Sequence, residues 1–132
     1  MSRVLVDTNA YSALMAGDGR VADELARSEV VALSPVVIGE LLEGFLLGSR
    51  ANENRAILAR FRGKPRTVCL PVTDATAEWF AEIKRMLRAK GRPIPANDVW
   101  IAASCMEHGC RLLSFDAHFA AIDGLLRVPG FG

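Results

Sequence analysis

Short apolar segments of strand type alternate along this chain with longer segments of helical type. Each apolar segment spans about four residues and is rich in valine and leucine, a pattern typical of strands buried on both faces of a sheet. Strands separated by helices usually pair in parallel, with helices packed on both faces. We therefore predict a single domain over residues 1–132 of the α/β class, with three layers (α/β/α) around a central, mostly parallel sheet of four to five strands. The expected strands are residues 3–6, 30–33, 67–70, 111–114 and, at the sheet edge, 125–128.

Capping residues predict where several helices begin and end. Ser34 followed by Pro35 is a strong helix start, because a serine side chain caps free backbone N–H groups and proline suits the first helical position. Gly91 and Gly109 are expected just past helix ends, where glycine is common. Asn97 is expected to open the helix that carries the last long apolar face. The expected helices are residues 21–28, 34–47, 51–62, 73–90 and 97–108, with a short helical turn at 116–122.

Composition indicates a protein with its own hydrophobic core and no membrane span. Apolar residues make up 51% of the chain, enough to bury a core. The richest apolar stretch, residues 30–38, is interrupted by Ser34 and Pro35 and falls short of the roughly 18 residues that cross a bilayer. The first residues lack the long apolar segment of a signal peptide. We therefore expect a cytoplasmic protein without membrane contact.

The three cysteines, Cys69, Cys105 and Cys110, are an odd number without a paired C-x-x-C spacing. This usage argues against both a disulfide framework and a zinc site. We expect three free thiols with structural roles.

Four carboxylates stand at positions where a charged group needs an explanation. Asp7 and Asp116 each follow an expected strand, and binding sites of open α/β folds collect at the carboxyl ends of strands. Glu40 is expected on the same helical face as Val37 and Leu47, and Asp98 on the apolar face of the helix at 97–108.

Carboxylates on apolar faces are costly unless they are paired or bind a cation, and the basic residues are concentrated elsewhere. Oxygen ligands without cysteine or histidine favour Mg²⁺ or Mn²⁺ over zinc. The four acids therefore predict a site for one or more such cations. For Asp98 and Asp116 a structural role at a helix N-terminus stays open as the alternative.

Five short motifs follow one another in a defined order along the chain. They are Val6-Asp7-Thr8-Asn9, residues 34–41 (SPVVIGEL), residues 97–103 (NDVWIAA), residues 112–119 (LLSFDAHF) and residues 122–125 (IDGL). Together they resemble the PIN domain, and specifically the VapC-type toxins of bacteria and archaea, over essentially the whole chain. Ser114-Phe115-Asp116 departs from the more familiar threonine–arginine–acid form of that motif but keeps its hydroxyl and its acid.

The resemblance implies a function and a set of site residues. It implies an endoribonuclease that hydrolyses structured RNA with Mg²⁺ or Mn²⁺ and causes growth arrest. It further implies a cognate antitoxin, whose C-terminal segment blocks the cleft, and a homodimer. The implied metal-binding catalytic residues are Asp7, Glu40, Asp98 and Asp116, with Thr8, Asn9 and Ser114 in supporting positions.

Basic residues are distributed unevenly although the net charge is only +1. Residues 50–66 and 84–92 hold eleven of the sixteen lysines and arginines and one acid, Glu53. We expect a basic face that contacts RNA phosphates, although a solvated helix face explains the second run equally well. Dimer contacts are expected on the outer faces of the helices at 34–47 and 50–62. The candidate RNA-binding residues are Arg60, Arg62, Lys64, Arg66, Lys84, Arg85 and Arg88.

Other phosphate-handling folds fit less well. A haloacid-dehalogenase-type phosphotransferase needs a second aspartate two residues after the first, where this chain has Asn9. A dinucleotide-binding domain needs a G-x-G-x-x-G turn after the first strand, and the sequence contains none there. The remaining alternative is a catalytically silent RNA- or protein-binding module with the same fold. His108 and His118 are expected to be structural or exposed, because the proposed carboxylate chemistry needs no imidazole.

Overall fold

A four-stranded parallel sheet forms the centre of the computed structural model, which describes residues 2–132. Every pair of neighbouring strands is parallel, and their order across the sheet is β3-β2-β1-β4. The strands are β1 (Arg3–Val6), β2 (Val30–Leu33), β3 (Thr67–Cys69) and β4 (Arg111–Leu113).

The central strand is buried on both faces, which explains its uninterrupted apolar sequence. Val4, Leu5 and Val6 are fully buried. Leu5 pairs with Ala32 of β2 on one side and with Leu112 of β4 on the other. The hydrophobic effect therefore stabilises this strand from both faces of the sheet.

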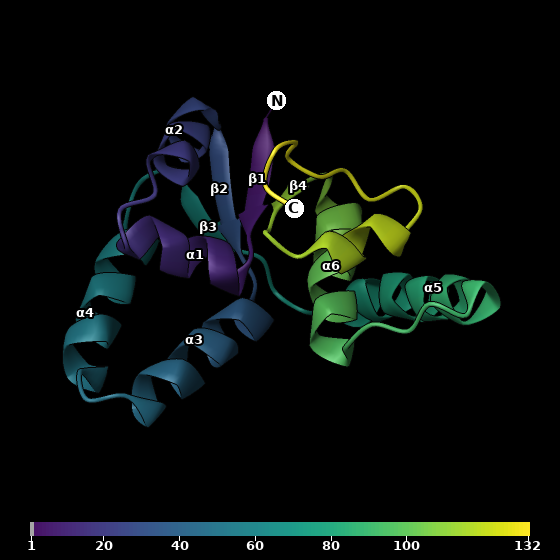
Figure 1. The fold of residues 1–132 in the computed structure, drawn as a ribbon, viewed down its shortest axis with the longest axis horizontal. Helices are drawn as coiled ribbons and strands as arrows, with labels where there is room; N and C mark the ends of the chain where they lie inside the picture. Colours follow the sequence, from purple (N-terminus) through teal and green to yellow (C-terminus); the bar gives the residue numbers. More distant parts are fainter. Residues whose placement is uncertain (1) are drawn as a thin grey trace.

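Helices cover the sheet on two sides (Figure 1): α1 to α4 gather on one side, and α5 and α6 on the other. The predicted three-layer α/β/α architecture is confirmed. The helices are α1 (Thr8–Met15), α2 (Gly19–Arg27), α3 (Pro35–Leu47), α4 (Ala51–Arg62), α5 (Asp74–Lys90) and α6 (Ala96–His108), followed by the 3₁₀ helix η1 (Ala117–Ala121).

Most helix boundaries agree with the predicted caps. The Ser34 hydroxyl accepts a hydrogen bond from the Val37 amide at 3.2 Å, and α3 begins at the next residue, a proline. Gly91 and Gly109 end α5 and α6 with φ of 64° and 65°, a left-handed conformation that glycine adopts without strain. The prediction that Asn97 opens α6 is wrong by one residue. The helix starts at Ala96, and the Pro95 carbonyl accepts the first amide bonds without a side-chain cap.

The predicted fifth strand at residues 125–128 is not formed within the described chain. This segment makes a single parallel bridge, between Arg127 and Leu112. Leu112 donates its amide to Leu126 at 2.8 Å and accepts one from Val128 at 2.9 Å. After Val128 the chain turns at Pro129 and Gly130, where Gly130 has a φ of 89°, so the segment leaves the sheet after a single bridge.

The order of the strands reverses beside β1. The chain passes from β1 to β2 on one side, whereas β4 reaches the other side only after α5 and α6. Open α/β sheets bind ligands beyond the carboxyl ends of the strands at such a switch point. Among residues 2–132, no helix has both the length and the apolar character that a bilayer span requires.

Candidate active site

An acidic cleft of about 580 Å³ opens at the carboxyl ends of β1 and β4. The beginnings of α1, α3 and α6 converge on this end of the sheet (Figure 1). All four predicted carboxylates, which come from four separate segments, line it. The lining residues are Asp7, Thr8, Asn9, Glu40, Pro95, Ala96, Asn97, Asp98 and Asp116.

Asp7 is the most buried of the four acids, with 3% of its surface exposed. It stands between β1 and α1, where it caps the helix. One carboxylate oxygen accepts the Thr8 amide at 2.8 Å, and the other accepts the Ser114 hydroxyl at 2.6 Å. Burial raises the pKa of Asp7; these two hydrogen bonds oppose the rise, and the nearby charges of Asp98 and Glu40 add to it.

Glu40 is held by two polar side chains of other elements. The Thr8 hydroxyl donates to Oε1 at 2.5 Å, and the Asn97 amide donates to Oε2 at 3.3 Å. Thr8 thus links the start of α1 to α3. Asn97 was not among the predicted site residues, although its position directly before Asp98 was a signal for it.

The predicted apolar face around Glu40 is partly wrong. The buried residues of α3 are Val37 and Leu41, whereas Leu47 is 85% exposed. Glu40 therefore lies at the edge of the buried face, half-buried and directed to the cleft.

His118 lies between two of the predicted acids. Its Nε2 is 2.8 Å from Asp98 Oδ2, and its Nδ1 is 3.7 Å from Asp116 Oδ1. His118 was expected to be structural or exposed; its side chain is one third exposed and contacts a predicted site acid, and its place two residues after Asp116 is the sequence signal for this contact. Burial raises the pKa of Asp98; contact with His118 opposes this, and the charges of Glu40 and Asp116 reinforce it.

Asn9 and Ser114 hold the loop that carries Asp116. The Phe115 amide donates to the Asn9 side-chain oxygen at 3.3 Å. The Asp116 amide donates to the Ser114 hydroxyl at 3.1 Å, while that hydroxyl itself donates to Asp7. Both predicted supporting residues therefore connect the end of β1 to the segment after β4.

The donor atoms in the cleft suit a divalent cation. Ligand atoms of Asp98, Asp116 and His118 all lie within 4.8 Å of one another, and Asp7 and Glu40 line the same cleft outside this group. We call these three residues the histidine–aspartate group. Within residues 2–132, the described ion pairs of lysine and arginine go to other acids: Asp18, Glu24, Glu82 and Asp123.

The carboxylates thus gather in a partly desolvated cleft and repel one another, and the basic group in contact with them is an imidazole. A bound cation would relieve this repulsion, so the residues present fit a metal site.

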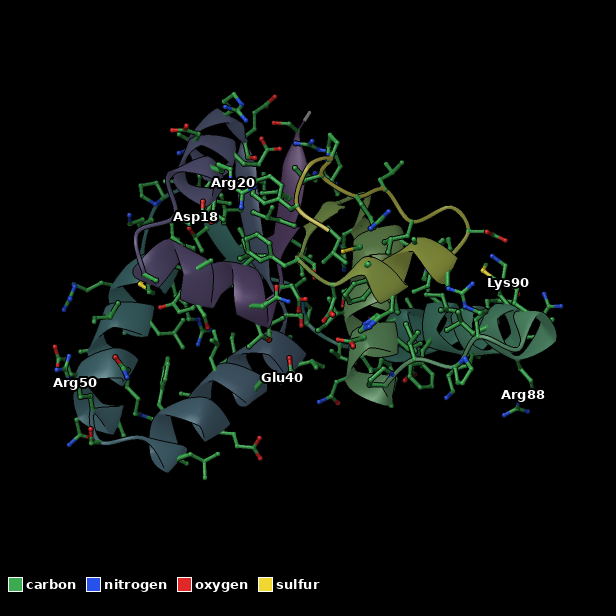
Figure 2. All side chains as sticks on the ribbon, viewed as in Figure 1. Asp18, Arg20, Glu40, Arg50, Arg88 and Lys90 are labelled. Carbon is green, nitrogen blue, oxygen red and sulfur yellow. The ribbon has the colours of Figure 1, made fainter. Side chains whose placement is uncertain are left out.

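The predicted basic face is divided into two surfaces. α4 and α5 lie at opposite ends of the molecule (Figure 1), and Figure 2 shows Glu40 between the distant Arg50 and Arg88. One residue from each basic surface also makes a contact within the protein. The Arg66 guanidinium donates to the Ser28 carbonyl, and Arg85 pairs with Glu82 at 2.6 Å. The exposed candidates are Arg60, Arg62, Lys64 and Arg66 near the end of α4, and Lys84, Arg85 and Arg88 on α5.

Comparisons with known proteins agree with this architecture. A family model described as PIN domain matches residues 4–125. Ribonuclease VapC5 of Mycobacterium tuberculosis is 31% identical over 124 residues, which cover 94% of this chain and 90% of that protein.

Two solved structures from the same organism cover nearly the whole chain. The VapBC-5 toxin–antitoxin complex has a TM-score of 0.72 at 28% identity, covering 97% of this chain and 100% of that chain. VapC20, described as a toxin that cleaves the sarcin–ricin loop, has a TM-score of 0.70 at 27% identity, covering 95% and 98%. With the family model matching nearly its full length, the chain belongs to the PIN domain family, in its VapC-type branch.

Proposed function

We propose that this protein is a divalent-cation-dependent endoribonuclease that acts as the toxin of a toxin–antitoxin pair. The observation that carries the proposal is the acidic cleft, in which four carboxylates from distant segments face one another. A relative of near-equal length is named a ribonuclease, and a solved neighbour is described as a toxin that cleaves the sarcin–ricin loop. Both names support the same reaction class for this chain.

The residues that would hold Mg²⁺ or Mn²⁺ are Asp7, Glu40, Asp98 and Asp116. Such a cation supplies charge neutralisation at a phosphodiester and activation of water. The chain's own contribution is to keep the carboxylates in place before RNA arrives. Because every donor to Asp7 and Glu40 comes from a helix start or a strand end, little reorganisation is needed when the substrate binds.

RNA would reach the cleft between the two basic surfaces. Lysine and arginine contacts to phosphates position a nucleic acid but carry little sequence information. The residues on α4, at one end of the molecule, and on α5, at the other, would contact the backbone on either side of the scissile bond. This arrangement suits a folded RNA that extends beyond the cleft in both directions.

The antitoxin would block the same cleft. In the described part of the chain, the ion pairs of lysine and arginine do not involve the cleft carboxylates. An arginine of the antitoxin's C-terminal segment would therefore form charge-assisted hydrogen bonds with these carboxylates.

A homodimer would cover apolar side chains at the end of α3, where Leu46 and Leu47 are 70% and 85% exposed. We place the protein in the cytoplasm, where structured RNA is present.

The test is cleavage of structured RNA by the purified protein with Mg²⁺ or Mn²⁺. We expect cutting that EDTA stops and that Asp7→Asn reduces by about a hundredfold or more, since one site carboxylate is lost. Asp23→Asn, which changes an exposed acid of α2, is the matched control and should cut normally.

Two results would contradict the proposal. If Asp7→Asn cuts as fast as the wild type, another site or a contaminating nuclease is responsible. If the wild type binds RNA without cutting it under any of these conditions, the protein is a silent binding module.

A further inference from the structure

Both ring nitrogens of His118 face carboxylates of the acidic cleft. Nε2 is 2.8 Å from Asp98 and Nδ1 is 3.7 Å from Asp116. The ring also packs against Phe119, with centroids 4.9 Å apart, and about a third of the side chain is exposed. The imidazole is therefore held against two acids that line the cleft and stays partly exposed.

The spacing of these atoms is close to that of ligands around one cation. Adjacent ligands of an octahedral ion with bonds of about 2.1 Å lie about 3.0 Å apart, and opposite ligands about 4.2 Å apart. The ligand atoms of the histidine–aspartate group lie within 4.8 Å of one another, and His118 Nε2 is 2.8 Å from Asp98 Oδ2. The widest separation allowed in the group, 4.8 Å, exceeds the distance between opposite ligands by about 0.6 Å, so one ion would have to draw the three side chains only slightly closer.

We propose that His118 is a nitrogen ligand that makes this cleft select Mn²⁺ over Mg²⁺. The inference rests on the proposed function, because it concerns the same cations. Mg²⁺ is a hard ion that prefers carboxylate and water oxygens, whereas first-row transition cations accept imidazole more readily. A site made of carboxylates alone would discriminate less between the two ions than one with a mixed set of oxygen and nitrogen ligands.

The first experiment measures metal binding to the full chain without RNA. MgCl₂ and MnCl₂ are titrated calorimetrically into the wild type, His118→Gln and His108→Gln. The control changes the other histidine of the chain, which lies beside Glu107 at the far end of α6. We expect His118→Gln to weaken Mn²⁺ binding by about tenfold or more, to change Mg²⁺ binding far less, and His108→Gln to change neither.

The second experiment detects the ligand directly. Pulsed electron paramagnetic resonance of bound Mn²⁺ should show nitrogen-14 modulation in the wild type and in His108→Gln, and none in His118→Gln. The wild-type spectrum decides the question by itself if a variant does not fold.

Absence of nitrogen modulation from the wild type, or equal weakening of both ions in His118→Gln, would overturn the inference and make His118 a residue that only positions Asp98. RNA cleavage that EDTA stops would leave the proposed function standing in that case. Failure of the wild type to bind either ion would overturn both proposals.

Discussion

The surroundings of Asp7 destabilise the charged form of its carboxyl group. Its carboxylate is almost completely buried, and it lies near two further acids, yet its hydrogen-bond donors are a hydroxyl and a backbone amide. These two donors offset only part of the cost, because burial and the neighbouring charges together raise its pKa. A group with this environment is expected where a cation or substrate supplies the missing charge.

Replacing Asp7 with asparagine should stabilise the metal-free protein. The pKa of Asp7 is raised in the folded state above its value of 3.8 in the unfolded chain. Between these two pKa values the folded state binds more protons than the unfolded state, so the protein loses stability as the pH rises through this interval. Asp7→Asn keeps the shape and an oxygen for the Thr8 amide but carries no charge. Above the interval we expect it to be more stable than the wild type by about 1.4 kcal/mol for each unit by which the pKa is raised.

Urea unfolding between pH 3 and 8 in EDTA checks this. The difference in the free energy of unfolding between Asp7→Asn and the wild type should grow with pH and then level off. The same difference for Asp23→Asn should not grow. Added Mn²⁺ should stabilise the wild type more than Asp7→Asn. A variant that is less stable than the wild type at neutral pH would contradict the argument.

The helices position the site through their ends. Asp7 precedes α1, Thr8 begins it, and Asn97 and Asp98 lie in the first turn of α6. At its other end α6 stops at Gly109, whose positive φ turns the chain toward β4, and the Cys110 amide bonds back to the Cys105 carbonyl at 2.9 Å. The orientation of α6, and with it the place of Asp98, therefore depends on both ends of this helix.

A side chain at Gly109 should destabilise the protein. Its φ of 65° lies in the left-handed region, where an L side chain costs roughly 1–2 kcal/mol, although no atom stands within 4 Å of the added Cβ. We expect Gly109→Ala to lower the free energy of unfolding by about 1 kcal/mol. Gly63→Ala is the matched control, since Gly63 ends α4 with φ of −80° and only ordinary contacts. Equal effects of the two substitutions in urea unfolding would refute the backbone explanation.

At the scale of the whole molecule, the acidic cleft lies between two surfaces that each carry a cluster of lysine and arginine. The net charge of +1 therefore does not describe the local electrostatic potential at the cleft or at the two basic surfaces. The cleft lies at the carboxyl ends of β1 and β4. The helices α4 and α5 lie at opposite ends of the molecule (Figure 1). In the proposed function, an RNA that contacts both basic surfaces crosses the acidic cleft, and its backbone lies beside the carboxylates.

RNA affinity should depend on salt through both surfaces. Each lost phosphate contact should reduce the slope of log affinity against log salt concentration by about 0.7 on single-stranded RNA. The pairs Arg60→Ala/Arg62→Ala and Lys84→Ala/Arg88→Ala are measured separately on a cleavage-deficient Asp7→Asn background. Arg27→Ala, which changes an exposed arginine of α2, is the control. A pair that leaves both affinity and slope unchanged lies outside the RNA path.

The sequence by itself determined the features that depend on near neighbours in the chain. Apolar runs such as Val4-Leu5-Val6 predicted the buried strands, and Ser34 with Pro35 predicted the start of α3, because burial periodicity and capping act over a few residues. The ordered motifs predicted the family, and the strand-end acids predicted where a cleft would open. The predicted fifth strand pairs at a single residue, because the chain turns at Pro129 and Gly130 just beyond the predicted segment.

Only the tertiary structure decided which distant side chains meet. His118 contacts Asp98 from 20 residues away, and Asn97 contacts Glu40 from 57 residues away. Neither pairing follows from a local pattern, because each depends on how α6 packs beside α3 and on how the segment after β4 turns back over the cleft. The same packing divided the basic runs between two ends of the molecule, since α4 and α5 lie on opposite sides of the sheet.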